Sequence, residues 1–151
     1  LLTSDAGELF AAVADGRLAE ITTRWREGAA ACVVLAAPGY PAAPVRGIEI
    51  GVPGNVPDDV LVFHAGTRAV DSSGRDAAGG TRSEAAAGAA SPAARATAPG
   101  RRRYLTNGGR VLDIVALGLD VPSAVAKAYE AVESVDFPGV VMRGDIGGGI
   151  D

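Results

Sequence analysis

Two stretches of the sequence space their apolar residues as an amphipathic helix does. Residues 4–14 place several apolar side chains on one face, with Ser4 positioned to cap the start and Gly16 to stop the end. Residues 122–134 repeat apolar positions with helical spacing, and Pro122 suits a first turn. The apolar positions of this second stretch are Val125, Ala128, Tyr129 and Val132. We therefore expect a short helix near the N-terminus and a longer one near the C-terminus.

Short apolar runs bounded by glycine, proline or asparagine predict strands. The predicted strands are 30–36, 46–50, 59–65, 104–106, 109–117 and 137–142. Asn107 and Gly108 separate two of these runs, and this dipeptide is the usual signal for a tight hairpin turn. Sequential strands with a segregated helix indicate the α+β class. We expect a small mixed or antiparallel sheet flanked by one long helix and preceded by a terminal helix.

Residues 72–102 interrupt this pattern. From 76 to 99, 20 of 24 residues are Ala, Gly, Ser, Thr or Pro, and none is Val, Ile, Leu or aromatic. Such a segment cannot bury enough apolar surface to offset its ordering entropy. We predict a disordered insertion in the form of a solvated loop. Its arginines leave open a basic RNA-binding arm, although it has no aromatic residue to stack on bases.

The amino-acid composition limits the classes of protein to which this chain can belong. The 151 residues suit one domain, and the net charge of −4 argues against a strong nucleic-acid binder. No apolar run approaches the roughly 18 residues of a membrane span. One Cys and one His exclude a Cys/His zinc cluster, so no metal site is expected. These observations predict a cytoplasmic protein without nucleic-acid or membrane partners.

The residues alone form no complete active site, because nucleotide-binding glycine loops and the common hydrolase motifs are absent. Cys32 lies within an apolar run, which favours a buried, inert thiol. A Cys32–His64 catalytic pair is rejected because nothing would orient the histidine.

Three polar, glycine-containing clusters remain, each at the edge of a predicted strand. Their members are Gly39, Tyr40 and Pro41; His64, Gly66 and Thr67; and Asn107, Gly108, Gly109 and Arg110. One interpretation is simple turn chemistry. The other is a shared rim facing a ligand, where backbone N–H groups and Arg110 contact a phosphate.

Five runs, in this order, resemble one enzyme family. They are AACVVLAAPGYPAAPVRG, DVLVFHAGT, LTNGGRVLDIVALG, AVAKAYEAVESV and MRGDIG. Together they resemble the C-terminal domain of phosphoribosylamine–glycine ligase, also called glycinamide ribonucleotide synthetase. The resemblance covers residues 1–71 and 103–147. It implies that 1–24 end an ATP-grasp domain and its connector, that 25–147 form the C-terminal domain around the 72–102 insertion, and that 148–151 are a loose tail.

The resemblance implies an ATP-dependent ligase of purine biosynthesis. The family joins glycine to 5-phosphoribosylamine through a glycyl phosphate, using ATP with Mg²⁺ or Mn²⁺. Its nucleotide and metal sites lie in the N-terminal and ATP-grasp domains, outside the matched region. We therefore expect no catalytic residue in this chain, no bound ATP or metal, and no activity without those domains. The three clusters map onto the substrate cleft, with Arg110 the first candidate.

Four features depart from the family pattern. Gly144 stands where the family usually has a second basic residue, which argues against an electrostatic role for that segment. Arg46 replaces a customary lysine, Asp113 falls where the family tends to have a small residue, and the insertion at 72–102 replaces a short hairpin connection. Two other functions stay open: a non-catalytic β-rich binding module, and the C-terminal domain of a different ATP-grasp ligase.

Overall fold

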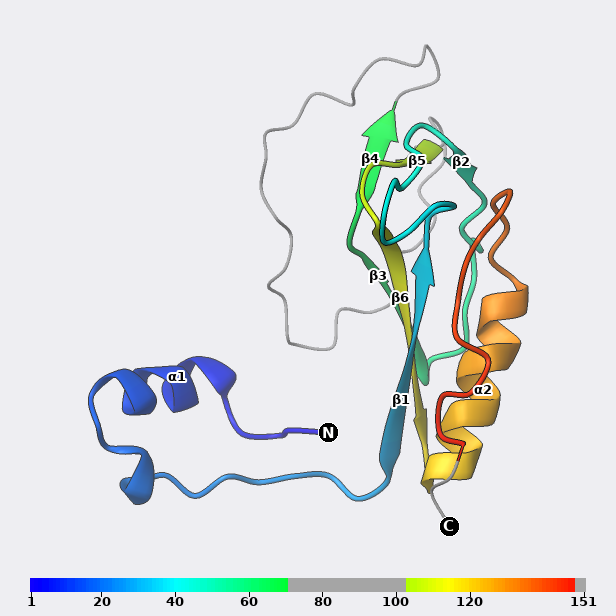
Figure 1. Ribbon diagram of the computed structural model, residues 1–151. Coiled ribbons are helices and arrows are strands. Elements are labelled where there is room, and N and C mark those ends of the chain that lie inside the picture. Colours follow the sequence, from blue (N-terminus) through cyan, green and yellow to red (C-terminus); the bar gives the residue numbers. More distant parts are fainter. Residues whose placement is uncertain (71–102, 149–151) are drawn as a thin grey trace.

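The computed structural model describes residues 1–70 and 103–148 (Figure 1). The predicted insertion at 72–102 and residues 149–151 of the predicted tail lie outside them. The described elements are α1 (Ala6–Ala14), the 3₁₀ turn η1 (Leu18–Glu20), β1 (Ala29–Ala36), β2 (Glu49–Ile50), β3 (Val60–His64), β4 (Thr67–Val70), β5 (Arg103–Thr106), β6 (Arg110–Gly118) and α2 (Val121–Glu133). Two helices and two small antiparallel sheets make this an α+β fold, as predicted.

Sheet 1 consists of β1, β6 and β3, with β6 in the centre. Every pairing is antiparallel, and Val33 lies opposite Ile114 in the register. Alternate residues of β1 and β6 point toward α2, which covers one face of the sheet (Figure 1). Val33, Leu35, Leu112 and Ile114 are almost fully buried there. This layer is the hydrophobic core of the domain.

Helix α2 is fixed at its start by a capping box. Asp120 accepts a hydrogen bond from the Ser123 backbone N–H (2.8 Å), and the Ser123 hydroxyl lies 3.2 Å from the Asp120 N–H. Pro122 falls in the first turn, as predicted. Ala124 and Ala128 are fully buried, so their small side chains let the helix approach the sheet closely. The prediction of a helix over 122–134 is confirmed within one residue at each end.

Sheet 2 contains β2, β5 and β4, with β5 in the centre. The predicted hairpin between 104–106 and 109–117 is wrong, because β5 and β6 belong to different sheets. Neither Asn107 nor Gly108 adopts the positive φ that a primed hairpin turn requires. The chain instead crosses here from sheet 2 into sheet 1. Residues 107–109 are therefore a junction between sheets.

The strand predicted over 46–50 is shortened to β2 (Glu49–Ile50), and β4 (Thr67–Val70) was not predicted. Two other boundaries also differ from the prediction. The cap of α1 is Asp5, whose carboxylate accepts from the Glu8 N–H at 2.9 Å. The predicted cap, Ser4, instead accepts from the Arg24 N–H at 2.7 Å. The predicted strand 137–142 is reduced to one bridge, in which Val141 exchanges two backbone hydrogen bonds with Ala36.

The N-terminal segment stands apart from the core. Helix α1 packs on η1, and Figure 1 shows it on the opposite side of sheet 1 from α2. Backbone bonds from Thr3 to Arg24 and from Arg26 to Leu1 fold the segment back on itself. Neither α1 nor α2 has the length and apolar character that a membrane span requires.

Candidate functional site at the junction of the two sheets

The structure brings the three predicted clusters together at the junction of the sheets. We call Gly39–Pro41, His64–Thr67 and Thr106–Arg110 the rim. The Tyr40 ring lies over Gly109, where an added Cβ would come within 2.5 Å of the ring. An added Cβ on Gly66 would come within 2.3 Å of the Arg110 carbonyl oxygen. These glycines let the loops approach closely, so they do more than form isolated turns.

Backbone hydrogen bonds tie the three clusters to one another. The Ala37 N–H donates to the Gly109 carbonyl at 2.8 Å, which holds the loop beginning at Gly39. The Asn107 N–H donates to the Gly66 carbonyl, also at 2.8 Å. The backbone of the rim is therefore preorganised by sheet-like contacts.

Thr106 anchors the junction from inside. Its side chain is buried, its hydroxyl donates to the Val45 carbonyl at 3.0 Å, and its oxygen accepts from the Ile48 N–H at 3.1 Å. Both backbone groups would otherwise lack these bonds where the 45–48 loop meets sheet 2. The sequence placed Thr106 beside the Asn107–Gly109 cluster, but nothing in the sequence marked it as a buried anchor.

His64 is held by two neighbours at the end of β3. Its Nδ1 lies 3.0 Å from the Thr67 hydroxyl, and its ring lies 4.3 Å from the Tyr104 ring, centre to centre. Although the side chain keeps an exposed edge, partial burial lowers the pKa of His64. The ring is therefore neutral at pH 7 and can offer one donor and one acceptor.

Arg110 is exposed at the start of β6, next to an irregularity in the pairing. Leu35 lies opposite Leu112, but Ala36 lies opposite Arg110, so the register shifts by one residue. Such bulges redirect side chains next to functional sites. Within residues 1–70 and 103–148 the Arg110 guanidinium has no hydrogen bond or ion pair, and Asp145, a potential partner, is paired with Arg143. Arg110 is thus available to bind an anion.

Cys32 does not have the buried position that the sequence predicted. It is exposed on the face of sheet 1 that α2 does not cover. Partial burial and the nearby Asp113 carboxylate raise the pKa of the thiol, so little thiolate forms at neutral pH. The expectation of a buried thiol is wrong because alternate residues of β1 point to different faces, and within the described ranges α2 covers only the opposite face.

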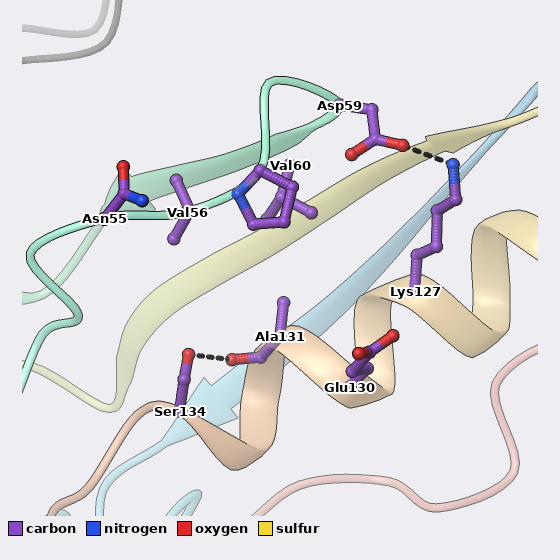
Figure 2. A pocket seen from close by; sticks show the side chains of 9 residues that line it. Asn55, Val56, Asp59, Val60, Lys127, Glu130, Ala131 and Ser134 are labelled. Carbon is purple, nitrogen blue, oxygen red and sulfur yellow. Dashed lines mark hydrogen bonds and ion pairs between the residues drawn. The ribbon is translucent and has the colours of Figure 1, made fainter.

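A separate pocket of about 430 Å³ lies between α2 and the loop before β3 (Figure 2). Its walls are Val56, Val60 and Ala131, and an ion pair between Asp59 and Lys127 lies at one side. None of the predicted site residues lines this pocket. The rim, where the predicted residues converge, is therefore the better candidate for the functional site.

The described residues do not form a cluster that could hold a metal ion. No three His, Cys, Asp or Glu side chains come together in residues 1–70 and 103–148. Five of the carboxylates there already pair with basic side chains, namely those of Asp15, Glu20, Glu49, Asp59 and Asp145. The described residues therefore offer no ligand set for the Mg²⁺ of the resembled enzyme.

A known protein structure contains a region with the same fold as this chain. The crystal structure of phosphoribosylamine–glycine ligase from Thermotoga maritima superposes with a TM-score of 0.56 at 30% identity, covering 93% of this chain and 28% of that one. Its matching part shares the α+β architecture described above. The fold is thus that of a domain found within a larger ligase.

The sequence comparisons define the family. The family described as "Phosphoribosylglycinamide synthetase, C domain" matches residues 30–149, and the chain belongs to it. The phosphoribosylamine–glycine ligase of Phenylobacterium zucineum is 38% identical over 148 residues, and that of Synechocystis is 38% identical over 125. The aligned regions cover 97% and 82% of this chain but only 28% and 23% of the relatives.

Proposed function

We propose that this chain is the C-terminal part of a cytoplasmic ligase that joins glycine to 5-phosphoribosylamine. The observation that carries the proposal is the 38% identity to such a ligase over nearly the whole chain. In this proposal ATP and Mg²⁺ or Mn²⁺ bind to the N-terminal and ATP-grasp domains. This chain closes one side of the substrate cleft and has no activity alone.

The rim supplies the contact with substrate in this proposal. Phosphoribosylamine carries a phosphate, and an exposed, unpaired arginine can bind a phosphate through two parallel N–H donors. Among the residues that the structure describes, Arg110 is such a side chain, and the backbone of Asn107–Gly109 shapes the approach to it. Tyr40 and the His64–Thr67 pair border the same surface.

The experiment is a fusion in which this chain replaces the matching residues of the Phenylobacterium zucineum ligase. ADP release and amide formation are measured with glycine and phosphoribosylamine. We expect product from the fusion and none from the 151-residue chain alone. Turnover by the chain alone would contradict the proposal, as would a soluble, folded fusion without activity. Turnover with another amine or acid instead would point to a different ligase.

A further inference from the structure

Sheet 1 has a second face that no described element covers. The register places Cys32, Val115 and Leu61 in one row across the three strands, and Val34, Asp113 and Phe63 in the next. We call these six residues the open face. Helix α2 packs on the opposite face, and in the described part of the chain no helix packs on this one (Figure 1).

The open face is unusually apolar for a surface exposed to water. Phe63 is 51% exposed, and Leu61 and Val34 are also exposed. Five of the six side chains are apolar or a thiol, and Asp113 is the one charged group. Contiguous apolar patches of this kind mark interaction sites more often than free surface.

The N-terminal segment carries a second set of exposed apolar side chains. Phe10 is 71% and Trp25 is 64% exposed, and Val13 and Leu18 are exposed as well. Figure 1 shows α1 on the same side of sheet 1 as the open face, away from α2. One occupant on that side could contact both groups of apolar residues.

We propose that the open face is the docking surface for the remainder of the ligase, through an apolar surface that carries one cation opposite Asp113. This inference rests on the proposed function. The aligned relatives are more than three times as long as the region they share with this chain, so they contain a large body of protein that could cover the face.

A second copy of the chain is the weaker occupant. Two open faces packed about a twofold axis would bury the two Asp113 carboxylates in one apolar interface without a cation. Buried like charges without partners disfavour an interface strongly. A different protein surface can place a lysine or arginine against Asp113, which removes that cost.

Cys32 provides a direct measure of docking, because it is the single cysteine of the chain and lies on the open face. Maleimide labelling is followed at mildly alkaline pH in the isolated chain and in the fusion with the Phenylobacterium zucineum ligase, whose own cysteines are replaced by serine. We expect the fusion to label at least about tenfold more slowly, since burial protects a side chain from solvent reagents. The matched control combines Cys32→Ser with Leu119→Cys, because Leu119 is 94% exposed and lies between β6 and α2. Its labelling rate should be the same in both proteins.

Three results would overturn the inference. Equal labelling of Cys32 in chain and fusion would mean that the face stays open. Protection in the isolated monomer would mean that the chain covers its own face. Protection in the isolated chain that grows with concentration, together with a dimer mass, would identify a second copy as the occupant.

The two proposals fail in different ways. If the fusion forms product while Cys32 still labels rapidly, the ligase function stands and the docking surface falls. If Cys32 is protected but no product forms, the reverse holds. If the fusion is insoluble, the intact Phenylobacterium enzyme with glutamate at the position aligned with Phe63 gives the test. We expect at least a tenfold loss, roughly, of enzyme activity or of the yield of soluble, folded enzyme. Unchanged activity together with an unchanged yield would overturn the inference.

Discussion

At the scale of single residues, the rim contains a buried side chain that stabilises the fold and an exposed one that we propose contacts substrate. Thr106 is buried and uses its hydroxyl as both donor and acceptor. Arg110 is exposed, and no hydrogen bond or ion pair in the described ranges engages its guanidinium. Thr106 and Arg110 are four positions apart, yet substituting Thr106 should change the stability of the domain, whereas substituting Arg110 should change the kinetics of the ligase fusion.

Replacing Arg110 by alanine in the ligase fusion should impair substrate handling. Losing a charge-assisted bond costs about 1.5–3 kcal/mol, or roughly ten- to hundredfold in KM for phosphoribosylamine or in turnover. The free energy of unfolding measured in urea should stay within about 0.5 kcal/mol of the parent's. Arg103→Ala is the matched control, because Arg103 is an exposed arginine on β5 that pairs with Glu49 away from the rim. Unchanged kinetics for Arg110→Ala would remove Arg110 from the site.

Replacing Thr106 by valine should instead destabilise the domain. Valine has nearly the same shape but leaves the Val45 carbonyl and the Ile48 N–H without their partner. We expect a loss of about 1–3 kcal/mol in urea unfolding of the isolated chain. Thr106→Ser, which keeps the hydroxyl, should lose less. Thr67→Val removes an exposed hydroxyl contact with His64 and should cost less than about 1 kcal/mol. Equal losses at both threonines would refute the anchoring role.

At the scale of elements, the sequence predicted most helices and strands because their apolar spacing is local. Helix α2 and the central strand β6 follow directly from such spacing. The β5–β6 hairpin failed because Asn107-Gly108 is only a local signal, whereas Thr106 is fixed by contacts with residues far away in the sequence. Tertiary contacts decided which sheet each strand joined.

Burial on the two faces of sheet 1 also could not be predicted from the chain alone. Runs 30–36 and 59–65 are apolar at successive positions, as in strands covered on both sides. Among the described residues, only the face toward α2 is covered by a helix, and Cys32 and Phe63 on the other face are exposed. The convergence of the three glycine clusters was predicted only as one of two possibilities, because turn residues look the same whether their loops meet or not.

The start of α2 makes a prediction about pH. Hydrogen bonds from Ser123 lower the pKa of Asp120 below its ordinary value in the folded chain. The charged cap therefore stabilises the fold above the unfolded-state pKa of about 3.9, and this stabilisation is lost as pH falls through the lower folded-state pKa. Asp120→Asn keeps a good cap that does not titrate there. Its melting temperature should consequently fall less than the parent's between neutral pH and about pH 3.

The control for this prediction is Asp58→Asn, which changes an exposed aspartate in the loop before β3. Its melting temperature should follow the parent's through the same pH range. If Asp120→Asn and the parent lost stability in parallel, the carboxylate of Asp120 would have no part in the acid response.

At the scale of the whole molecule, the chain divides into a packed body and an N-terminal segment with little contact to it. No residue before Ala29 belongs to the main hydrophobic core or packs against it. The body, by contrast, extends beyond α2, because Val135 and Phe137 are buried in that core. Deleting residues from the N-terminus should therefore change the melting temperature less than deleting residues from the C-terminus.

A chain that begins at Glu27 should melt within about 2 °C of the parent, because it loses no core contact. A chain that ends at Ser134 loses the buried Phe137 ring and the Ala36–Val141 backbone bonds. Removing a buried phenylalanine alone costs about 3–5 kcal/mol, so this chain should melt at least about 10 °C lower or not fold. Circular dichroism melts of the three chains give the comparison. A large loss from the N-terminal deletion would show that the segment packs on the body. If the open face docks on the remainder of the ligase as proposed and α1 contacts the same surface, the N-terminal deletion should become destabilising in the ligase fusion.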